Sequence, residues 1–383
     1  MAKRIRHLAP RLLLAFLVAF LTGEIAVRAA VALNPRIRYI VADQELGEFS
    51  TLEALLETQP FLISHTGRFG YWTNSFGFND QEFEAPKPSG RRRILALGDS
   101  FCYGAVPYPY VVLTRVEEQL SNDTEVELDL LNCGLPGQDM SGYRALLQTT
   151  VDRFAPDLVV LHIYMGNDPP DIRLSSEPAI EFYLIRFLTR IGRLLEERPP
   201  AHHPEASPTP GQTVSGGTKV HPGGRELTDD DLAQPRFDEE ELERQLRGEL
   251  GRFLKTESTE AAWAPLKEEF DAIHQLLKTR EIPLVVILYP SRMQVYPERA
   301  MEFAERNGLS AGSVELQSPN VFFAGYCREK EIPLLDLTET MREAAQSGEP
   351  LYVANDTHWN IRGNAVAAEA EARFLSPLIS EGR

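Results

Sequence analysis

Four short segments carry side chains of the kinds used in nucleophilic catalysis: GDS at 98–100, NCGLPG at 132–137, GND at 166–168 and NDTHWN at 355–360. A serine hydroxyl becomes a nucleophile when an imidazole removes its proton, and a carboxylate behind the imidazole fixes its tautomer. Each segment alone is a common turn sequence. Together they supply a hydroxyl, glycine amides, an asparagine amide, a carboxylate and an imidazole, which predicts nucleophilic catalysis.

The first three segments each follow an apolar run that predicts a β-strand, and further runs occur later in the chain. The expected strands are 93–98, 126–134, 157–166, 283–291 and 332–337. Helices are expected at 107–121, 140–153, 260–280, 337–346 and 361–376. Apolar runs alternating with helices predict a doubly wound α/β/α fold with about five parallel strands. Because ligands bind beyond the carboxyl ends of such strands, Ser100 stands where a nucleophile belongs.

The three cysteines bear on the nucleophile's neighbourhood. Cys102 occupies the last position of the G-x-S-x-G pattern, so the α/β-hydrolase elbow is absent. Cys102 and Cys133 follow neighbouring strands, and a disulfide between them is one alternative. An odd count without a C-x-x-C pair favours the other, namely that these two and Cys327 are buried free thiols. His162 lies inside an expected strand and is interpreted as a structural residue.

The four segments resemble those of the SGNH hydrolases, also called the GDSL esterase/lipase superfamily. The matching blocks are ILALGDSFCYG, NCGLPGQD, MGND and DTHWN, and the resemblance covers about 92–170 and 260–378. Within this superfamily the sequence is most similar to a bacterial membrane-anchored branch with a DTHWN-type C-terminal block. That block resembles the corresponding block of alginate O-acetyltransferase-like proteins. The resemblance implies the flavodoxin-like SGNH fold. No cofactor is expected, because the sequence contains no G-x-x-x-x-G-K-[ST], H-E-x-x-H or G-x-G-x-x-G motif.

The resemblance also implies roles for single residues. Ser100 would be the nucleophile, Gly137 and Asn167 would complete an oxyanion hole with the Ser100 amide, and Asp356 and His358 would complete the triad. Many SGNH proteins place the acid three residues before the histidine, where this chain has Asn355, whereas the acetyltransferase-like branch uses D-x-H. A carboxylate stabilises imidazolium better than an amide does, so we assign the triad role to Asp356 and a loop role to Asn355.

The N-terminus has the order of an export signal. Four Lys/Arg residues precede an apolar run at 12–22, followed by an Ala-x-Ala sequence at 30–32. One interpretation is a cleaved signal peptide. The other is a retained membrane anchor at 12–33, in which Glu24 and Arg28 pair at i and i+4. Both predict a domain outside the cytoplasmic membrane, attached to it or secreted.

Composition separates the other regions. Residues 1–38 form the signal segment, 39–91 an irregular lead-in, 92–169 with 258–383 the hydrolase domain, and 170–257 an insertion. Within the insertion, 198–236 is rich in Pro, Gly, Ser and Asp and is expected to be disordered. It holds His202, His203 and His221, for which a solvated linker is favoured over a metal site.

Three functions remain open. The leading hypothesis is an exported serine esterase that hydrolyses O-acyl esters, of short acyl chains, through a covalent acyl-enzyme. The alternatives are an O-acyltransferase that modifies an envelope polysaccharide and a non-catalytic envelope-binding protein that retains the fold. The expected partners are an acyl ester (a small molecule, lipid or glycan) and a membrane; no metal site is expected. The net charge of −17 disfavours nucleic acid.

Overall fold

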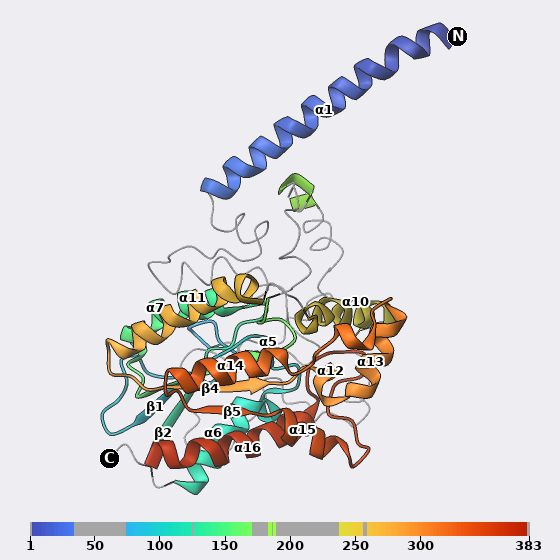
Figure 1. Ribbon diagram of the computed structural model, residues 1–383. Coiled ribbons are helices and arrows are strands. Elements are labelled where there is room, and N and C mark those ends of the chain that lie inside the picture. The colour runs from blue at the N-terminus through green and yellow to red at the C-terminus, as the bar shows by residue number, and fades with distance from the viewer. Residues whose placement is uncertain are drawn as a thin grey trace, which may run out of the picture. The chain divides into compact units, whose positions relative to one another are not determined.

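Five parallel strands form the sheet on which the rest of the chain is arranged, as the computed structural model in Figure 1 shows. The strands are β1 (Arg92–Leu97), β2 (Leu128–Asn132), β3 (Leu158–Tyr164), β4 (Leu284–Tyr289) and β5 (Leu334–Asp336). Their order is β2-β1-β3-β4-β5. This is the flavodoxin-like order, in which the winding direction reverses between β1 and β3. The predicted fold class, with all five expected strands, is confirmed.

The structure describes residues 2–33, 74–124, 126–170, 183–185, 187–188, 237–255 and 259–380. The predicted disorder at 198–236, with its three histidines, and most of the lead-in lie outside these residues. The chain divides into two compact units. One contains the N-terminal helix and residues 183–188, the other contains the sheet, and each is described by itself.

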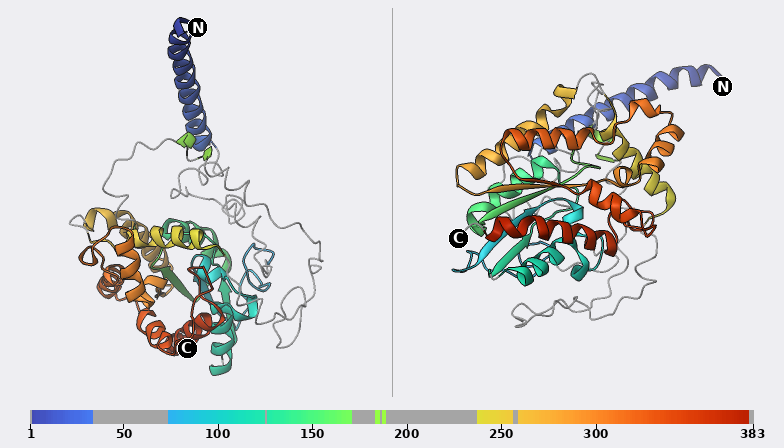
Figure 2. Two further views of the ribbon diagram at one scale, coloured as in Figure 1. Left: turned by 90° about the vertical axis from the view of Figure 1, so that its right-hand side faces the viewer. Right: turned by 60° about the horizontal axis from the view of Figure 1, so that its bottom comes forward.

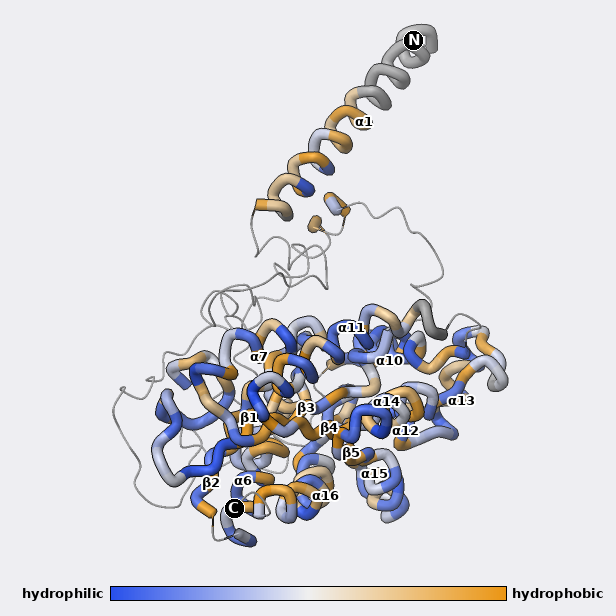
Figure 3. The backbone as a smooth tube through the Cα atoms, turned by 60° about the vertical axis from the view of Figure 1, so that its left-hand side comes forward, coloured by the Kyte–Doolittle hydropathy of each residue, from blue (hydrophilic) through white to orange (hydrophobic). Residues whose placement is uncertain are grey.

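The strands are buried on both faces, as their continuous apolar sequences require. Every residue of β3 and of β4 is buried, and the two strands pair in register from Val159 with Leu284 to Tyr164 with Tyr289. Figure 3 shows hydrophobic residues, in orange, along these central strands. The loops that follow the strands therefore start from a rigid edge.

Helices cover both faces of the sheet (Figures 1 and 2). On one face α6 (Val112–Asp123) packs against α16 (Ile361–Ser380), beside α15 (Thr338–Ala345). On the other, α7 (Met140–Phe154) packs against α11 (Thr259–Lys278). All five expected helices are present. The first begins at Val112 and not at 107, because Pro107 and Pro109 favour a tight 3₁₀ turn, Tyr108–Tyr110, before it.

Several helices were not expected from the sequence. They are α5 (Ser100–Tyr103), α12 (Arg292–Val295), α13 (Pro297–Arg306) and α14 (Ser318–Glu329). Proline stands in the first turn of both α13 and α14, where its missing N–H costs no hydrogen bond. The segment expected to be an insertion contains α10 (Glu239–Leu250), followed by the 3₁₀ turn Gly251–Phe253.

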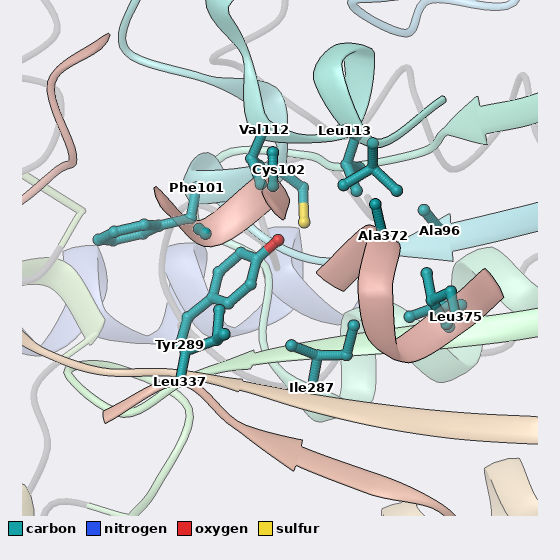
Figure 4. Packing of buried hydrophobic residues seen from close by; sticks show 14 of the residues in the cluster. Ala96, Phe101, Cys102, Val112, Leu113, Ile287, Tyr289, Leu337, Ala372 and Leu375 are labelled. Carbon is teal, nitrogen blue, oxygen red and sulfur yellow. The ribbon is translucent and has the colours of Figure 1, made fainter. Parts of the chain in front are cut away.

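The core between the sheet and α16 lies directly behind the expected nucleophile. Figure 4 shows the Tyr289 hydroxyl pointing toward the sulfur of Cys102. All three cysteines are buried and free, which confirms the favoured interpretation. His162 is also buried, with Nδ1 3.0 Å from the Leu97 carbonyl oxygen and Nε2 3.2 Å from Glu371 Oε2. It is a structural residue that ties α16 to the sheet, as predicted.

The N-terminal helix α1 spans Ala2–Leu33. Within it, Arg28 donates to Glu24 over 2.8 Å, as their i, i+4 spacing predicted. The Glu24 carboxylate also accepts from the backbone amides of Tyr183 and Leu184. The prediction that residues 12–33 cross a membrane is not supported: within the part of the chain that the structure describes, no helix has a stretch both long and apolar enough to do so.

One glycine fixes how α16 approaches the loop before it. A Cβ added to the buried Gly363 would lie 2.2 Å from the Leu351 carbonyl oxygen and 2.9 Å from Trp359 Cβ. Gly363→Ala should therefore reduce the free energy of unfolding by about 1–3 kcal/mol, through displaced backbone. Thermal unfolding measures this as a fall in Tm of several degrees.

The matched control is Gly325→Ala, at an exposed position of α14 with nothing within 4 Å. It should leave stability unchanged or raise it by about 0.5–1 kcal/mol, because alanine loses less backbone entropy in a helix. Equal Tm values for the two variants would contradict the close approach at Gly363.

Candidate active site

Ser100 lies at the carboxyl edge of the sheet, next to the point where the winding direction reverses. β1 ends at Leu97, and after Gly98 and Asp99 the chain turns into α5, whose first residue is Ser100. Asp99 caps this helix by accepting from the Phe101 amide over 2.9 Å. The half-buried Ser100 side chain therefore has a fixed position at a helix start.

His358 and Asp356 reach Ser100 from the loop before α16. His358 Nε2 lies 2.7 Å from Ser100 Oγ, and His358 Nδ1 lies 2.7 Å from Asp356 Oδ1. The same carboxylate oxygen accepts from the His358 backbone amide over 3.2 Å, and Asp356 is fully buried. The three side chains thus form one continuous hydrogen-bonded chain from hydroxyl to carboxylate.

Asn355 and Asp356 differ in conformation and in their contacts within this loop. Asn355 has φ of 54°, a left-handed conformation that asparagine tolerates better than most residues. The side chain that hydrogen-bonds with His358 Nδ1 is that of Asp356, through Oδ1. Asn355 therefore stands at a turn that brings the next side chain inward.

Two further contacts hold the imidazole loop. Arg292, in the first turn of α12, donates through Nη1 to the Asp356 carbonyl oxygen over 3.0 Å. The ring of Phe101 stacks on the His358 imidazole, with 4.8 Å between centroids and 29° between planes. Since Phe101 follows Ser100 directly, one short helix carries both the hydroxyl and the surface against which the imidazole packs.

Asn167 is tied through Asp99 to the turn that holds Ser100. Its Nδ2 donates to Asp99 Oδ2 over 2.7 Å, while Asp99 Oδ1 caps α5. Burial raises the pKa of the Asp99 carboxyl, and the hydrogen bonds from Phe101 and Asn167 oppose this rise. A side-chain amide has two N–H donors, and the bond to Asp99 uses one and fixes the direction of the other. Sequence reasoning did not assign this role to Asp99.

Gly137 lies in the loop between β2 and α7, at an exposed turn with φ of 74°. Its loop is bonded to β1 and to the turn after it: the Cys133 amide donates to the Ala96 carbonyl and the Leu135 amide to the Gly98 carbonyl. The loop ends at Asp139, which caps α7. The glycine expected in the oxyanion hole therefore belongs to a loop anchored beside Ser100.

A buried acid from α10 stands behind the imidazole, and sequence reasoning missed it. Glu249 Oε1 accepts from the Tyr164 hydroxyl over 2.5 Å, and the Tyr164 ring stacks on Phe101 with 4.0 Å between centroids. Burial raises the pKa of Glu249 to about 7. The residue lies in the segment expected to be an insertion, and its one signal was its place beside the apolar Leu250, at the end of a helix rich in charged residues.

The arrangement can transfer a proton from the Ser100 hydroxyl to an imidazole whose other nitrogen bonds to a carboxylate. Ser100, Gly137 and Asn167, the three residues expected to form an oxyanion hole, follow three neighbouring strands at the same edge of the sheet. Among the residues that the structure describes, no group of three or more His, Cys, Asp or Glu side chains could hold a metal ion.

Comparison with known proteins gives a family match over the C-terminal part of the chain. Residues 245–382 match the SGNH hydrolase-like domain of the acetyltransferase AlgX. This range includes Asp356, His358 and Glu249 but not Ser100. The chain is also 26% identical over 106 residues to a probable alginate O-acetylase AlgJ from Pseudomonas fluorescens. That match spans 28% of this chain and 25% of the relative, so it covers about a quarter of the relative's length.

Solved structures with overlapping backbones include TesA, at 12% identity and a TM-score of 0.39, covering 75% of this chain and 99% of TesA. A lipase/acylhydrolase from Enterococcus faecalis overlaps at 15% identity and a TM-score of 0.34, covering 75% and 96% of the two chains. The resemblance to the SGNH hydrolases predicted from the four sequence blocks is confirmed by the family match: over residues 245–382 the chain matches an SGNH hydrolase-like domain of the AlgX acetyltransferase type.

Proposed function

We propose that this protein is a serine esterase of the SGNH type that hydrolyses O-acyl esters of short acyl chains. The observation that carries the proposal is the hydrogen-bonded chain from Ser100 Oγ through His358 to Asp356, with 2.7 Å at both links. A protein that only binds envelope components has no need of this chain, which disfavours the non-catalytic alternative.

In the proposed reaction Ser100 Oγ attacks the acyl carbonyl carbon while His358 Nε2 accepts the hydroxyl proton. The oxyanion accepts hydrogen bonds from the Ser100 and Gly137 amides and from Asn167 Nδ2. When the tetrahedral intermediate collapses, the leaving alcohol takes the proton from His358 and the acyl group stays on Ser100. Water, activated by His358, then attacks this acyl-enzyme and releases the acid.

A second candidate function is O-acyl transfer to a polysaccharide. It is favoured by the match to an acetyltransferase domain, which includes Asp356 and His358 with their D-x-H spacing. Transfer and hydrolysis share the acyl-enzyme and differ in what attacks it, a sugar hydroxyl or water. The relative is named as a probable alginate O-acetylase. The first test of this candidate function therefore uses acetyl as the acyl group and a uronate polymer as the acceptor.

The proposal also places the reaction outside the cytoplasm. The basic cluster before the apolar run at 12–22 has the order of an export signal. We propose 92–169 with 258–383 as the catalytic domain. α10 and the 3₁₀ turn after it contribute to this domain, because Glu249 of α10 bonds to Tyr164 and Arg252 of the turn donates to the Asn167 carbonyl oxygen.

An assay with p-nitrophenyl acetate tests the proposal and separates the two candidates. The full chain should release acetate at a rate that an alginate oligosaccharide does not change, and Ser100→Ala should reduce this rate to background. Acetate appearing on the oligosaccharide, measured by mass spectrometry, would establish transfer. A failure to turn over acetyl, butyryl and longer esters, with or without the acceptor, would refute both candidates.

The geometry of the imidazole loop predicts which residue supplies the triad acid. Asp356→Asn should lower kcat by about 10⁴ with KM little changed, because an amide favours the wrong imidazole tautomer and stabilises imidazolium poorly. Steady-state kinetics on p-nitrophenyl acetate measures both constants.

The matched control is Asn355→Gly, which removes the neighbouring amide but keeps a residue that adopts φ of 54° without strain. Its kcat should fall by less than about tenfold. If Asn355→Gly were the more damaging change, the role of the acid would pass to Asn355. Mild effects from both would place the acid outside this loop.

A further inference from the structure

The nucleophile's helix is too short to satisfy its own carbonyl groups. α5 has four residues, and the last carbonyls of any helix lack partners within it. Two side chains from other elements supply donors. Asn132 Nδ2, at the end of β2, donates to the Cys102 carbonyl over 2.7 Å, and Asn79 Nδ2 donates to the Tyr103 carbonyl over 2.6 Å. Both asparagines are almost fully buried.

Asn132 also holds the loop on the other side of the site. Its Oδ1 accepts from the Gly134 amide over 3.0 Å. Gly134 lies directly on α5, because a Cβ there would be 2.5 Å from Cys102 Cβ and 2.7 Å from the Tyr103 amide nitrogen. One side-chain amide therefore fixes the distance between the helix of Ser100 and the loop of Gly137.

The backbone of Asn132 is fixed in turn by a buried carboxylate. Asp80 Oδ2 accepts from the Asn132 amide over 2.9 Å, and Asp80 Oδ1 accepts from the Tyr108 hydroxyl over 2.9 Å. Burial, and then the charge of Glu117, raise the pKa of Asp80 to about 7. Asp80 follows Asn79 in the segment before β1. Two consecutive residues of a segment expected to be irregular thus reach beneath the nucleophile.

We propose that Asn132 is a positioning residue that holds Ser100 and the loop of Gly137 in one fixed relation, and that Asn79 and Asp80 support it from the segment before β1. The proposal rests on the proposed function, because it needs Ser100 as nucleophile and the 133–139 loop as part of the oxyanion hole. A shift of about 1 Å between two reacting groups can cost about 10²-fold in rate. Loss of the Asn132 side chain removes two of the bonds that oppose such a shift, one to α5 and one to the loop.

The test compares buried asparagines within one domain. Asn132→Ala should lower kcat on p-nitrophenyl acetate at least about tenfold while KM changes little, since substrate binding does not need the oxyanion geometry. The matched control is Asn320→Ala. Asn320 is equally buried and bonds to Gln294, Asp336 and Thr338, away from α5. Its loss should lower Tm yet leave kcat within about twofold.

Both variants are assayed well below their Tm, with competent sites counted by stoichiometric fluorophosphonate labelling. This count separates slower turnover from partial unfolding. A kcat for Asn132→Ala within about twofold of the parent, per labelled site, would overturn the proposal. If Asn132→Ala does not fold, Asn79→Ala replaces it, and an unchanged kcat for that variant overturns the proposal equally.

The parent protein distinguishes this failure from that of the proposed function. A parent that labels at Ser100 and turns over, alongside an equally fast Asn132→Ala, would refute the positioning role alone. A parent that neither labels nor turns over would refute the proposed function and this inference with it.

Discussion

The hydrogen bond between Ser100 Oγ and His358 Nε2 joins residues 258 positions apart and is 2.7 Å long. A bond of this length forms only if the rest of the domain places both side chains accurately. Neither residue can reach the other unless β1 and the loop before α16 come to the same edge of the sheet. The parallel strands provide that edge. The core between the sheet and α16 then fixes the distance, since α16 packs on α6 and bonds through Glu371 to His162 of β3. The close approach at Gly363 holds the imidazole loop against the start of the same helix.

This edge contains many buried polar groups, and burying them costs free energy unless each finds a partner. Burial raises the pKa of Asp99, Asp80 and Glu249, and it raises the pKa of Asp168 well above its usual range. Each of the four carboxyls accepts a hydrogen bond from a group in or beside the site. Asp99 accepts from Phe101 and Asn167, and Asp80 accepts from Asn132 and Tyr108. Glu249 accepts from Tyr164, and Asp168 accepts from Tyr143. Such a network specifies one arrangement, because moving any element leaves a buried acid without its donor.

Much of this architecture follows from local sequence. The strands were predictable because two-face burial demands unbroken apolar runs such as those of β3 and β4. The edge residues Ser100, Asn167, Asp356 and His358 were predictable because their segments follow strands or precede a helix. The contacts from Asn79, Asp80 and Glu249 were not predictable, because each bond joins residues from 24 to 85 positions apart and leaves no periodic signal. The helices between β4 and β5 were missed for other reasons: α12 has only four residues, and α13 and α14 each carry a proline in the first turn, a residue that is also typical of loops.

Covalent labelling tests most directly whether Ser100 is the nucleophile. The full chain is treated with a fluorophosphonate, its intact mass is recorded, and the modified peptide is sequenced by tandem mass spectrometry. The account predicts one adduct, on Ser100, that is absent from Ser100→Ala. The buried thiol of Cys102, whose pKa is raised well above its usual value by burial, should stay unmodified. An adduct that persists in Ser100→Ala would contradict the account.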